Sequence, residues 1–205
     1  MLTRMLCLHA LVFALVATSV LAEHPRVVCN NITPTNPVGY SQVTGGWVGI
    51  ETVQFKDGQA FAPEDDVTPH ACLHGTTSDA TENGFKVSIE IQIPDRDVVK
   101  EDITLTSHGQ ANVTKNDYEF LLLAADKDRY LVYLVCMPPN EAGERLPLRV
   151  NLLARHDSQA DHSALSAEEL QALEARIGEK LGIAGHGVKP VKLCSSCWAS
   201  YTEDA

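Results

Sequence analysis

Basic residues are scarce in this chain, which has 16 Lys and Arg against 27 Asp and Glu and a formal net charge of -11. This surplus of negative charge repels phosphate groups, so nucleic acids and anionic membrane surfaces are disfavoured as partners. The sequence also lacks internal repeats, low-complexity tracts and any shift in composition that would mark a second domain. It contains no Gly-rich phosphate loop, no G-x-S-x-G turn and no H-E-x-x-H pair, so no catalytic residue is predicted.

Long apolar runs are confined to the N-terminus, where Arg4 precedes the stretch from Met5 to Leu21. A basic residue, a short apolar run and a small residue such as Ala22 are the parts of a secretory signal peptide. The run is short for a bilayer span, and no second segment of spanning length follows it, so stable membrane insertion is not expected. The sequence predicts a signal peptide over residues 1–22 and one extracellular domain over residues 23–205.

Cysteine is used sparingly, and one of the six, Cys7, lies in the predicted leader. The other five would enter an oxidising compartment, where an odd number leaves at least one without an intramolecular partner: Cys29, Cys72, Cys136, Cys194 and Cys197. The C-x-x-C spacing of the last two occurs in redox and zinc sites, but no second C-x-x-C or H-x-x-x-H accompanies it. A structural bridge with a spare thiol is favoured, and the connectivity stays open at this point.

The clearest secondary-structure signal is the segment 85–93, in which apolar and polar residues alternate strictly. A period of two indicates a strand with one buried face. The pattern returns around Ile103 and Leu105. Two strongly apolar runs, 120–123 and 130–135, flank a short polar connection typical of a hairpin, and 148–154 is a further strand candidate.

The periodicity changes after residue 155. Ser166 and Glu169 form a capping-box pattern, and apolar residues then follow at roughly helical spacing until Gly182. Several strands followed by one late amphipathic helix favour an antiparallel barrel or sandwich with the helix packed outside.

Three separated landmarks fit this pattern. Gly45 and Trp47 form a G-x-W motif after a lead-in rich in Pro, Gly and Asn, Asp126 lies between two predicted strands, and Arg155 ends the last one. In this order they resemble the motifs of the lipocalins, extracellular barrels that enclose small hydrophobic molecules. Asn116-Asp117-Tyr118 also resembles the second motif, but using it would place the run 120–123 inside a turn. A guanidinium over the indole would explain why Trp47 and Arg155 belong together.

The resemblance implies an all-β, up-and-down antiparallel barrel of about eight strands with one C-terminal α-helix packed outside. Between Cys72 and Phe120 the sequence shows three convincing strand segments where an eight-stranded barrel needs four, so one strand is expected to be short or missing. By resemblance to bilin-binding proteins and crustacean carotenoid carriers, we expect Cys29 to pair with Cys136, and Cys72 with Cys194 or Cys197.

The function implied by the resemblance is that of a secreted carrier, with no required cofactor, that binds a pigment, lipid, retinoid or pheromone. Inward apolar side chains would line the cavity, and the expected lining residues are Phe85, Val87, Ile89, Ile91, Ile103, Leu105, Phe120, Leu122 and Val132. A barrel can instead be filled by its own side chains. In that case, loops that bind or inhibit another protein would carry the function.

Two chemical alternatives are weaker. Some lipocalins resemble thiol-dependent isomerases, and Cys72 could supply such a thiol only if it is not in a disulfide. His70 and His74, or His156 and His162, would offer an incomplete ligand set, so no metal site is expected.

Two N-glycosylation sequons begin at Asn31 and Asn112. In a secreted chain, such sequons would place sugars on the surface. The sequence therefore predicts a glycoprotein.

Overall fold

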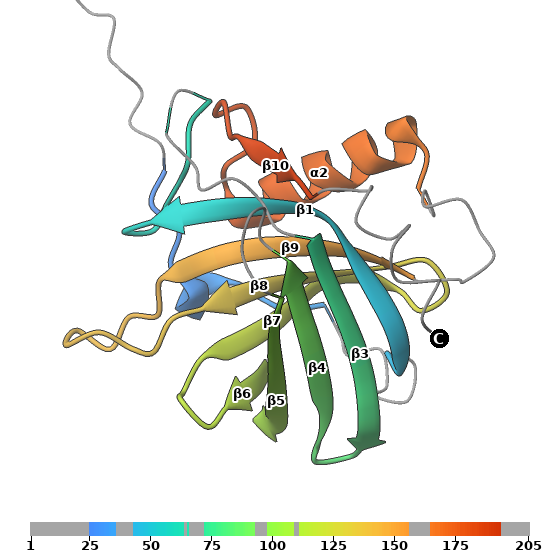
Figure 1. Cartoon of the computed structure of the whole chain (residues 1–205). Coiled ribbons are helices and arrows are strands. Elements are labelled where there is room, and N and C mark those ends of the chain that lie inside the picture. The colour runs from blue at the N-terminus through green and yellow to red at the C-terminus, as the bar shows by residue number, and fades with distance from the viewer. Residues whose placement is uncertain are drawn as a thin grey trace, which may run out of the picture.

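The computed structural model describes residues 25–35, 43–63, 65, 72–92, 98–108, 111–155 and 165–193. Eight of its strands form a barrel: β1 (Gly45–Lys56), β3 (Cys72–Thr81), β4 (Gly84–Gln92), β5 (Val99–His108), β6 (Ala111–Thr114), β7 (Glu119–Asp126), β8 (Tyr130–Cys136) and β9 (Pro147–Arg155). Each pairs antiparallel with the next, and β9 pairs back onto β1 from Trp47–Arg155 to Gln54–Arg149, which closes the barrel. The up-and-down topology predicted from the sequence is confirmed (Figure 1).

Three small elements lie outside this ring. The 3-10 helix η1 (Cys29–Asn31) precedes the barrel, and β2 (Gln59–Ala60) forms a hairpin with the end of β1. β10 (Pro190–Lys192) pairs with Glu51–Val53 of β1. A β-bulge between Gly49 and Glu51 lets β1 change neighbours, because β3 pairs only with its first part, residues 45–48.

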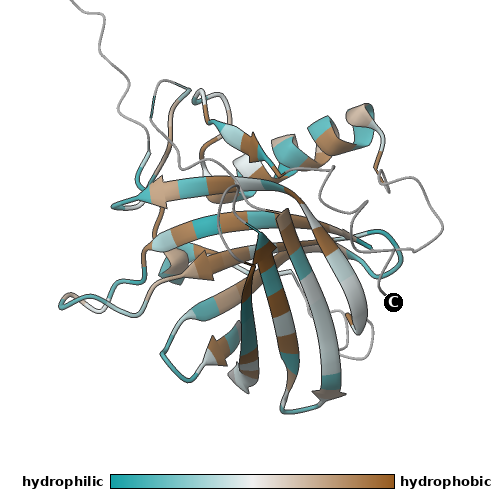
Figure 2. Cartoon of the chain, in the orientation of Figure 1, coloured by the Kyte–Doolittle hydropathy of each residue, from teal (hydrophilic) through white to brown (hydrophobic). Residues whose placement is uncertain are grey.

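The fourth strand between Cys72 and Phe120 is β6, which has only four residues. The expectation of one short strand is therefore confirmed, and three of its four residues, Ala111, Asn112 and Thr114, explain why sequence alone did not show it. Only Val113 is strongly apolar, so the segment lacks the alternation that marks β4. Figure 2 shows the contrast, with hydrophobic and hydrophilic bands alternating along β4.

Helix α2 (Ala167–Leu181) follows the barrel and lies against its outer wall (Figure 1). Its first turn has the predicted capping box, with Glu169 N–H donating to Ser166 and the Glu169 side chain accepting from the Ser166 backbone. Gly182 ends it in the left-handed conformation at φ 70°. An ion pair of 2.8 Å joins Arg129, in the β7–β8 turn, to Glu169 and holds this end of the helix.

The main hydrophobic core lies between α2 and the barrel wall. Leu173 and Leu181 of the helix pack with buried residues of β7, β8 and β9, among them Leu134, which is fully buried. A smaller cluster of Val43, Trp47, Leu122 and Leu131 fills one end of the barrel interior. Strand β8 is thus apolar on both faces.

Candidate ligand-binding site

One end of the barrel is closed by the pair that the sequence predicted. Trp47 is 1% exposed, and the Arg155 guanidinium carbon lies 4.2 Å from the centre of its ring. The indole N–H donates to the Val43 carbonyl at 2.8 Å, and Arg155 Nη1 donates to the Thr44 carbonyl at 2.6 Å. Both polar groups are therefore satisfied while the two flat side chains fill the end of the barrel.

Gly45 makes this stack possible. Its φ is +113°, and a Cβ added there would lie 2.9 Å from Arg155 Nη1. Only glycine adopts that backbone conformation without strain and leaves room for the guanidinium.

Replacing Gly45 with Ala is expected to lower the free energy of unfolding by about 1–3 kcal/mol, since the new methyl group adds backbone strain and displaces Arg155. Urea unfolding measures this directly. Gly143→Ala is the matched control, because Gly143 also has a positive φ of +76° but no atom within 4 Å of an added Cβ. Equal losses in the two variants would show that contact with Arg155 has no role.

Asp126 shapes the turn between β7 and β8. Its side chain accepts a hydrogen bond from the Asp128 backbone N–H at 3.1 Å, and its carbonyl accepts one from the Arg129 N–H at 3.0 Å. These are the bonds of an Asx turn, in which a short carboxylate replaces a backbone acceptor. The residue thus has a turn-forming contact, whereas Asn116-Asp117-Tyr118 lies in the separate β6–β7 turn.

Beyond the Trp47 end, the barrel encloses a cavity of about 80 Å³. Its walls come from β1, β3, β4, β5, β7, β8 and β9 and are mainly apolar. Six of the predicted lining residues are among them: Phe85, Val87, Ile89, Ile103, Leu105 and Phe120. Leu73, Leu131 and Leu153 add to the apolar wall.

The other three predicted residues lie elsewhere. Leu122 packs with Trp47 and Leu131 in the cluster that fills the closed end, and Ile91, near the end of β4, is not part of the cavity wall. The prediction for Val132 is wrong, because it faces α2 and belongs to the core outside the barrel. Its neighbours Leu131 and Tyr133 point into the barrel instead.

Sequence reasoning missed the polar part of the cavity, which comes mainly from β9. Arg149 and Asn151 line it together with Tyr133 and Thr77. Burial lowers the pKa of the Arg149 guanidinium, and within the described chain its buried Nε has no hydrogen-bond partner. The Asn151 side-chain oxygen accepts a hydrogen bond from Thr52 at 3.1 Å. A buried arginine of this kind is rare in an apolar interior, because removing its charge from water costs free energy.

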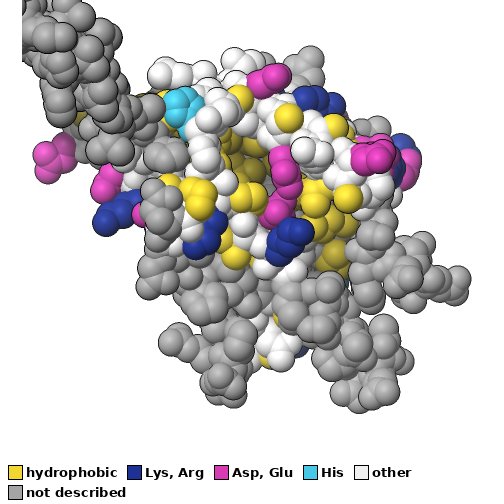
Figure 3. All heavy atoms as spheres, turned by 90° about the horizontal axis from the view of Figure 1, so that it is seen from above, with side chains coloured by type: hydrophobic (Ala, Val, Ile, Leu, Met, Phe, Trp, Pro, Cys, Tyr) yellow, Lys and Arg dark blue, Asp and Glu magenta, His cyan; other side chains and the backbone are white. Residues whose placement is uncertain are grey.

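A larger hollow, about 320 Å³, lies outside the barrel between α2 and strands β1, β9 and β10. Figure 3 shows the face that carries α2 and β10, where apolar side chains surround acidic ones. Glu51, 4% exposed, forms part of the wall. Burial, and next the hydrogen bond and negative charge of Glu174, raise the pKa of Glu51 to about 8. This carboxyl is therefore mostly protonated at neutral pH.

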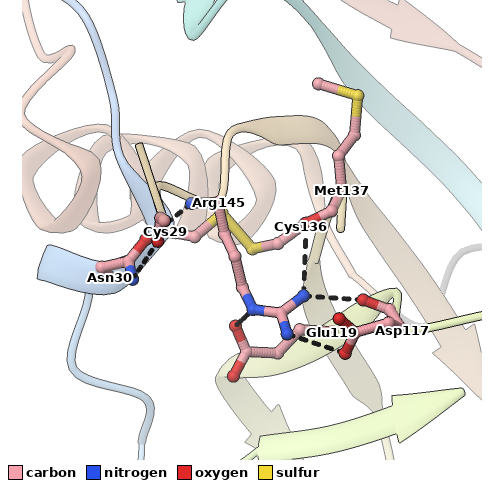
Figure 4. The surroundings of a disulfide bond; sticks show 8 residues. Cys29, Asn30, Asp117, Glu119, Cys136, Met137 and Arg145 are labelled. Atoms are coloured by element: carbon pink, nitrogen blue, oxygen red, sulfur yellow. Dashed lines mark hydrogen bonds and ion pairs between the residues drawn. A yellow bond between two sulfur atoms is a disulfide. The ribbon is translucent and has the colours of Figure 1, made fainter. Parts of the chain in front are cut away.

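One disulfide pair can be assigned, and a third cysteine is disulfide-bonded. Cys29 and Cys136 are bonded, with a Cα–Cα distance of 6.3 Å, and tie the N-terminal segment to the end of β8 (Figure 4). Cys72 is also disulfide-bonded. A cysteine in a disulfide carries no thiolate, so the thiol-dependent isomerase alternative loses its nucleophile. Cys194 and Cys197 lie outside the described residues.

The two predicted sugar acceptors differ in position. Asn31 is exposed at the end of η1, as a surface sequon requires. Asn112 is 8% exposed, and it pairs across β6–β7 with the inward-facing Phe120. The expectation that Asn112 lies on the surface is wrong, because its side chain is directed into the folded barrel, where a glycan has no room.

The remaining sequence hypotheses concern metals and membranes. In the described ranges, no group of three or more His, Cys, Asp or Glu could hold a metal ion. His74 lies on β3, whereas His70, His156 and His162 are outside those ranges, as is the predicted signal peptide. No described helix is long and apolar enough to cross a membrane.

The chain has the lipocalin fold. This fold is a closed eight-stranded up-and-down barrel with a Trp–Arg stack at one end and one helix outside. Siderocalin Ex-FABP is similar, with a TM-score of 0.53 and 16% identity over 75% of this chain and 95% of that one. Lobster apocrustacyanin A1 has a TM-score of 0.54 and 13% identity over 83% and 92%, and apocrustacyanin C2 a TM-score of 0.50 and 15% identity over 76% and 79%. No family model and no curated protein matches the sequence.

Proposed function

We propose that this protein is a secreted carrier that holds a small hydrophobic molecule in the barrel cavity and performs no chemistry on it. The observation that carries the proposal is the mainly apolar cavity inside the barrel, beside the Trp47–Arg155 stack. An apolar ligand gains roughly 25 cal/mol for each Å² that it buries in such walls. The lipocalin fold supports the same role.

The cavity volume narrows the class of ligand. At about 80 Å³ it is smaller than the roughly 300–1,000 Å³ of typical drug-sized sites. The aromatic side chains of Phe85, Phe120 and Tyr133 are part of its wall. A slender molecule, partly enclosed and with its other end at the mouth, suits this interior better than a wide ring system.

Secretion belongs to the proposal as well. The Cys29–Cys136 disulfide and the bonded Cys72 are typical of proteins that fold in an oxidising compartment. The apolar N-terminal run is the sequence feature that would direct the chain there.

Replacing Ile89 with Asp is expected to weaken binding of an apolar ligand by at least about tenfold, because a carboxylate on the cavity wall must lose water when the ligand enters. Displacement of a fluorescent apolar probe measures the affinity, and urea unfolding checks the fold. Thr104→Asp is the control, since Thr104 is exposed on the neighbouring strand. Equal affinities of both folded variants and the parent would place the ligand elsewhere, and a folded parent that binds no apolar probe would favour loops that bind a protein.

A further inference from the structure

The cavity contains one cation whose presence the packing does not explain. Arg149 lies on the inward face of β9, in register with Val135 of β8 and Gln54 of β1. It lines the same cavity as Phe85 and Ile89. A leucine or methionine would fill this position without the cost of removing a charge from water. A guanidinium at this position is therefore suited to an acidic partner that enters the cavity.

The bonding of Arg149 leaves it available to such a partner. Its Nε is buried and has no hydrogen-bond acceptor among the described residues, and it forms no ion pair with them. Glu101 of β5 and Tyr118 of the β6–β7 turn act on it only through longer-range electrostatics. Glu101 is exposed at the start of β5, so water screens most of its charge.

A second donor lies two residues along the same strand. Asn151 lines the cavity, and its side-chain oxygen already accepts the hydrogen bond from Thr52. Its Nδ2 hydrogens are therefore the part of the amide that remains for a group in the cavity. A planar guanidinium and an amide N–H2 on one face of one strand match the two oxygens of a carboxylate.

We propose that Arg149, assisted by Asn151, anchors an acidic headgroup, and that the ligand of this barrel is a slender amphipathic carboxylic acid of medium chain length. This inference rests on the proposed carrier function and specifies its ligand class. The apolar chain lies along Phe85, Val87 and Ile103 toward Trp47, where the cavity walls are apolar. The cavity volume of about 80 Å³ favours an unbranched chain over a bulky acid.

The test compares decanoic acid with decan-1-ol, which share a chain and differ in charge at pH 7.4. Isothermal titration of the full mature protein is expected to give at least tenfold tighter binding for the acid. In Arg149→Met that preference disappears, while decanol binds as it does to the parent. Arg149→Lys keeps a charge but not the two-pronged donor geometry, and is expected to retain only part of the preference.

Glu101→Gln is a matched variant that is expected to change the affinity for the acid in the opposite direction. Removing this carboxylate near Arg149 is expected to strengthen binding of decanoic acid about two- to fivefold at low salt and to leave decanol unchanged. The comparison of two ligands on the parent protein needs no variant, so a misfolded Arg149→Met does not remove the test.

The possible failures are distinct. Equal affinity of the parent for acid and alcohol overturns the anchoring role of Arg149 and leaves the carrier function in place. Binding of neutral apolar probes, with no binding of decanoic acid, overturns the ligand class alone. Absence of binding by every apolar probe, charged or neutral, overturns the proposed function and this inference together.

Discussion

A variant in which Cys29 and Cys136 are both replaced by Ser is expected to lose about 4 kcal/mol of its free energy of unfolding. The bond closes a loop with a sequence separation of 107 residues, and in the chain-entropy description long loops gain most from such a link. Both cysteines are also buried, at 2% and 0% exposure, so the serine hydroxyls enter an apolar core. Urea unfolding followed by circular dichroism measures the loss.

A control separates the covalent bond from the contacts around it. Arg145 N–H donates to Asn30 at 2.7 Å, and the Arg145 side chain donates to Asp117 and to the Met137 carbonyl (Figure 4). Asn30→Ala removes the hydrogen bond from Arg145 N–H and the longer one that Asn30 donates to the Gly143 carbonyl, without touching the disulfide, and is expected to cost about 1 kcal/mol. A double-serine variant no less stable than Asn30→Ala would contradict the role given to the bond.

The free energy of unfolding is also expected to depend strongly on pH, because of Glu51. Because the pKa of Glu51 in the folded protein is raised to about 8, the folded chain keeps a proton that the unfolded chain releases near pH 4.5. The folded state thus binds more protons between these values, and stability falls as pH rises from about 4.5 to about 8. The expected loss is on the order of 4 kcal/mol.

Glu51→Gln removes this dependence, because glutamine keeps the shape and a donor for Glu174 but has no proton to release. At pH 9 the variant is expected to be more stable than the parent by about 3–4 kcal/mol, whereas at pH 4.5 the two should differ little. Unfolding curves across this range provide the measurement. Glu141→Gln, a change on an exposed loop with the same loss of charge, is the control. Parallel pH profiles for parent and Glu51→Gln would show that the Glu51 carboxyl titrates normally.

Much of the fold could be predicted because several segments carry strong local signals. The strict alternation of β4 and the capping box of α2 each identify an element without reference to the rest of the chain. The Trp47–Arg155 stack was predicted from the resemblance to the lipocalin motifs, and closure of the barrel brings the two residues into register.

The inward face of the last strands could not be predicted, and β9 shows why. Alternation of Arg149 and Asn151 with Val150 and Leu152 ordinarily places the polar residues in water. Here α2 covers the outside of β9, so the apolar residues pack under the helix and the polar ones enter the barrel. The same covering reversed the assignment of Val132. A period of two gives the two faces of a strand but not which face another element will cover.

The shortness of β6 affects where the barrel opens locally. Its pairing with β7 spans only Asn112–Phe120 and Val113–Glu119. So short a ladder is expected to open locally at lower cost than the longer ladders of the barrel, and its amide hydrogens are expected to exchange with solvent sooner. The turn beyond it is held from outside by Arg145, which binds Asp117 and Glu119 beside the Cys29–Cys136 bond. The contacts around the disulfide thereby stabilise the shortest ladder of the barrel. Weakening these contacts is expected to increase local opening between β6 and β7.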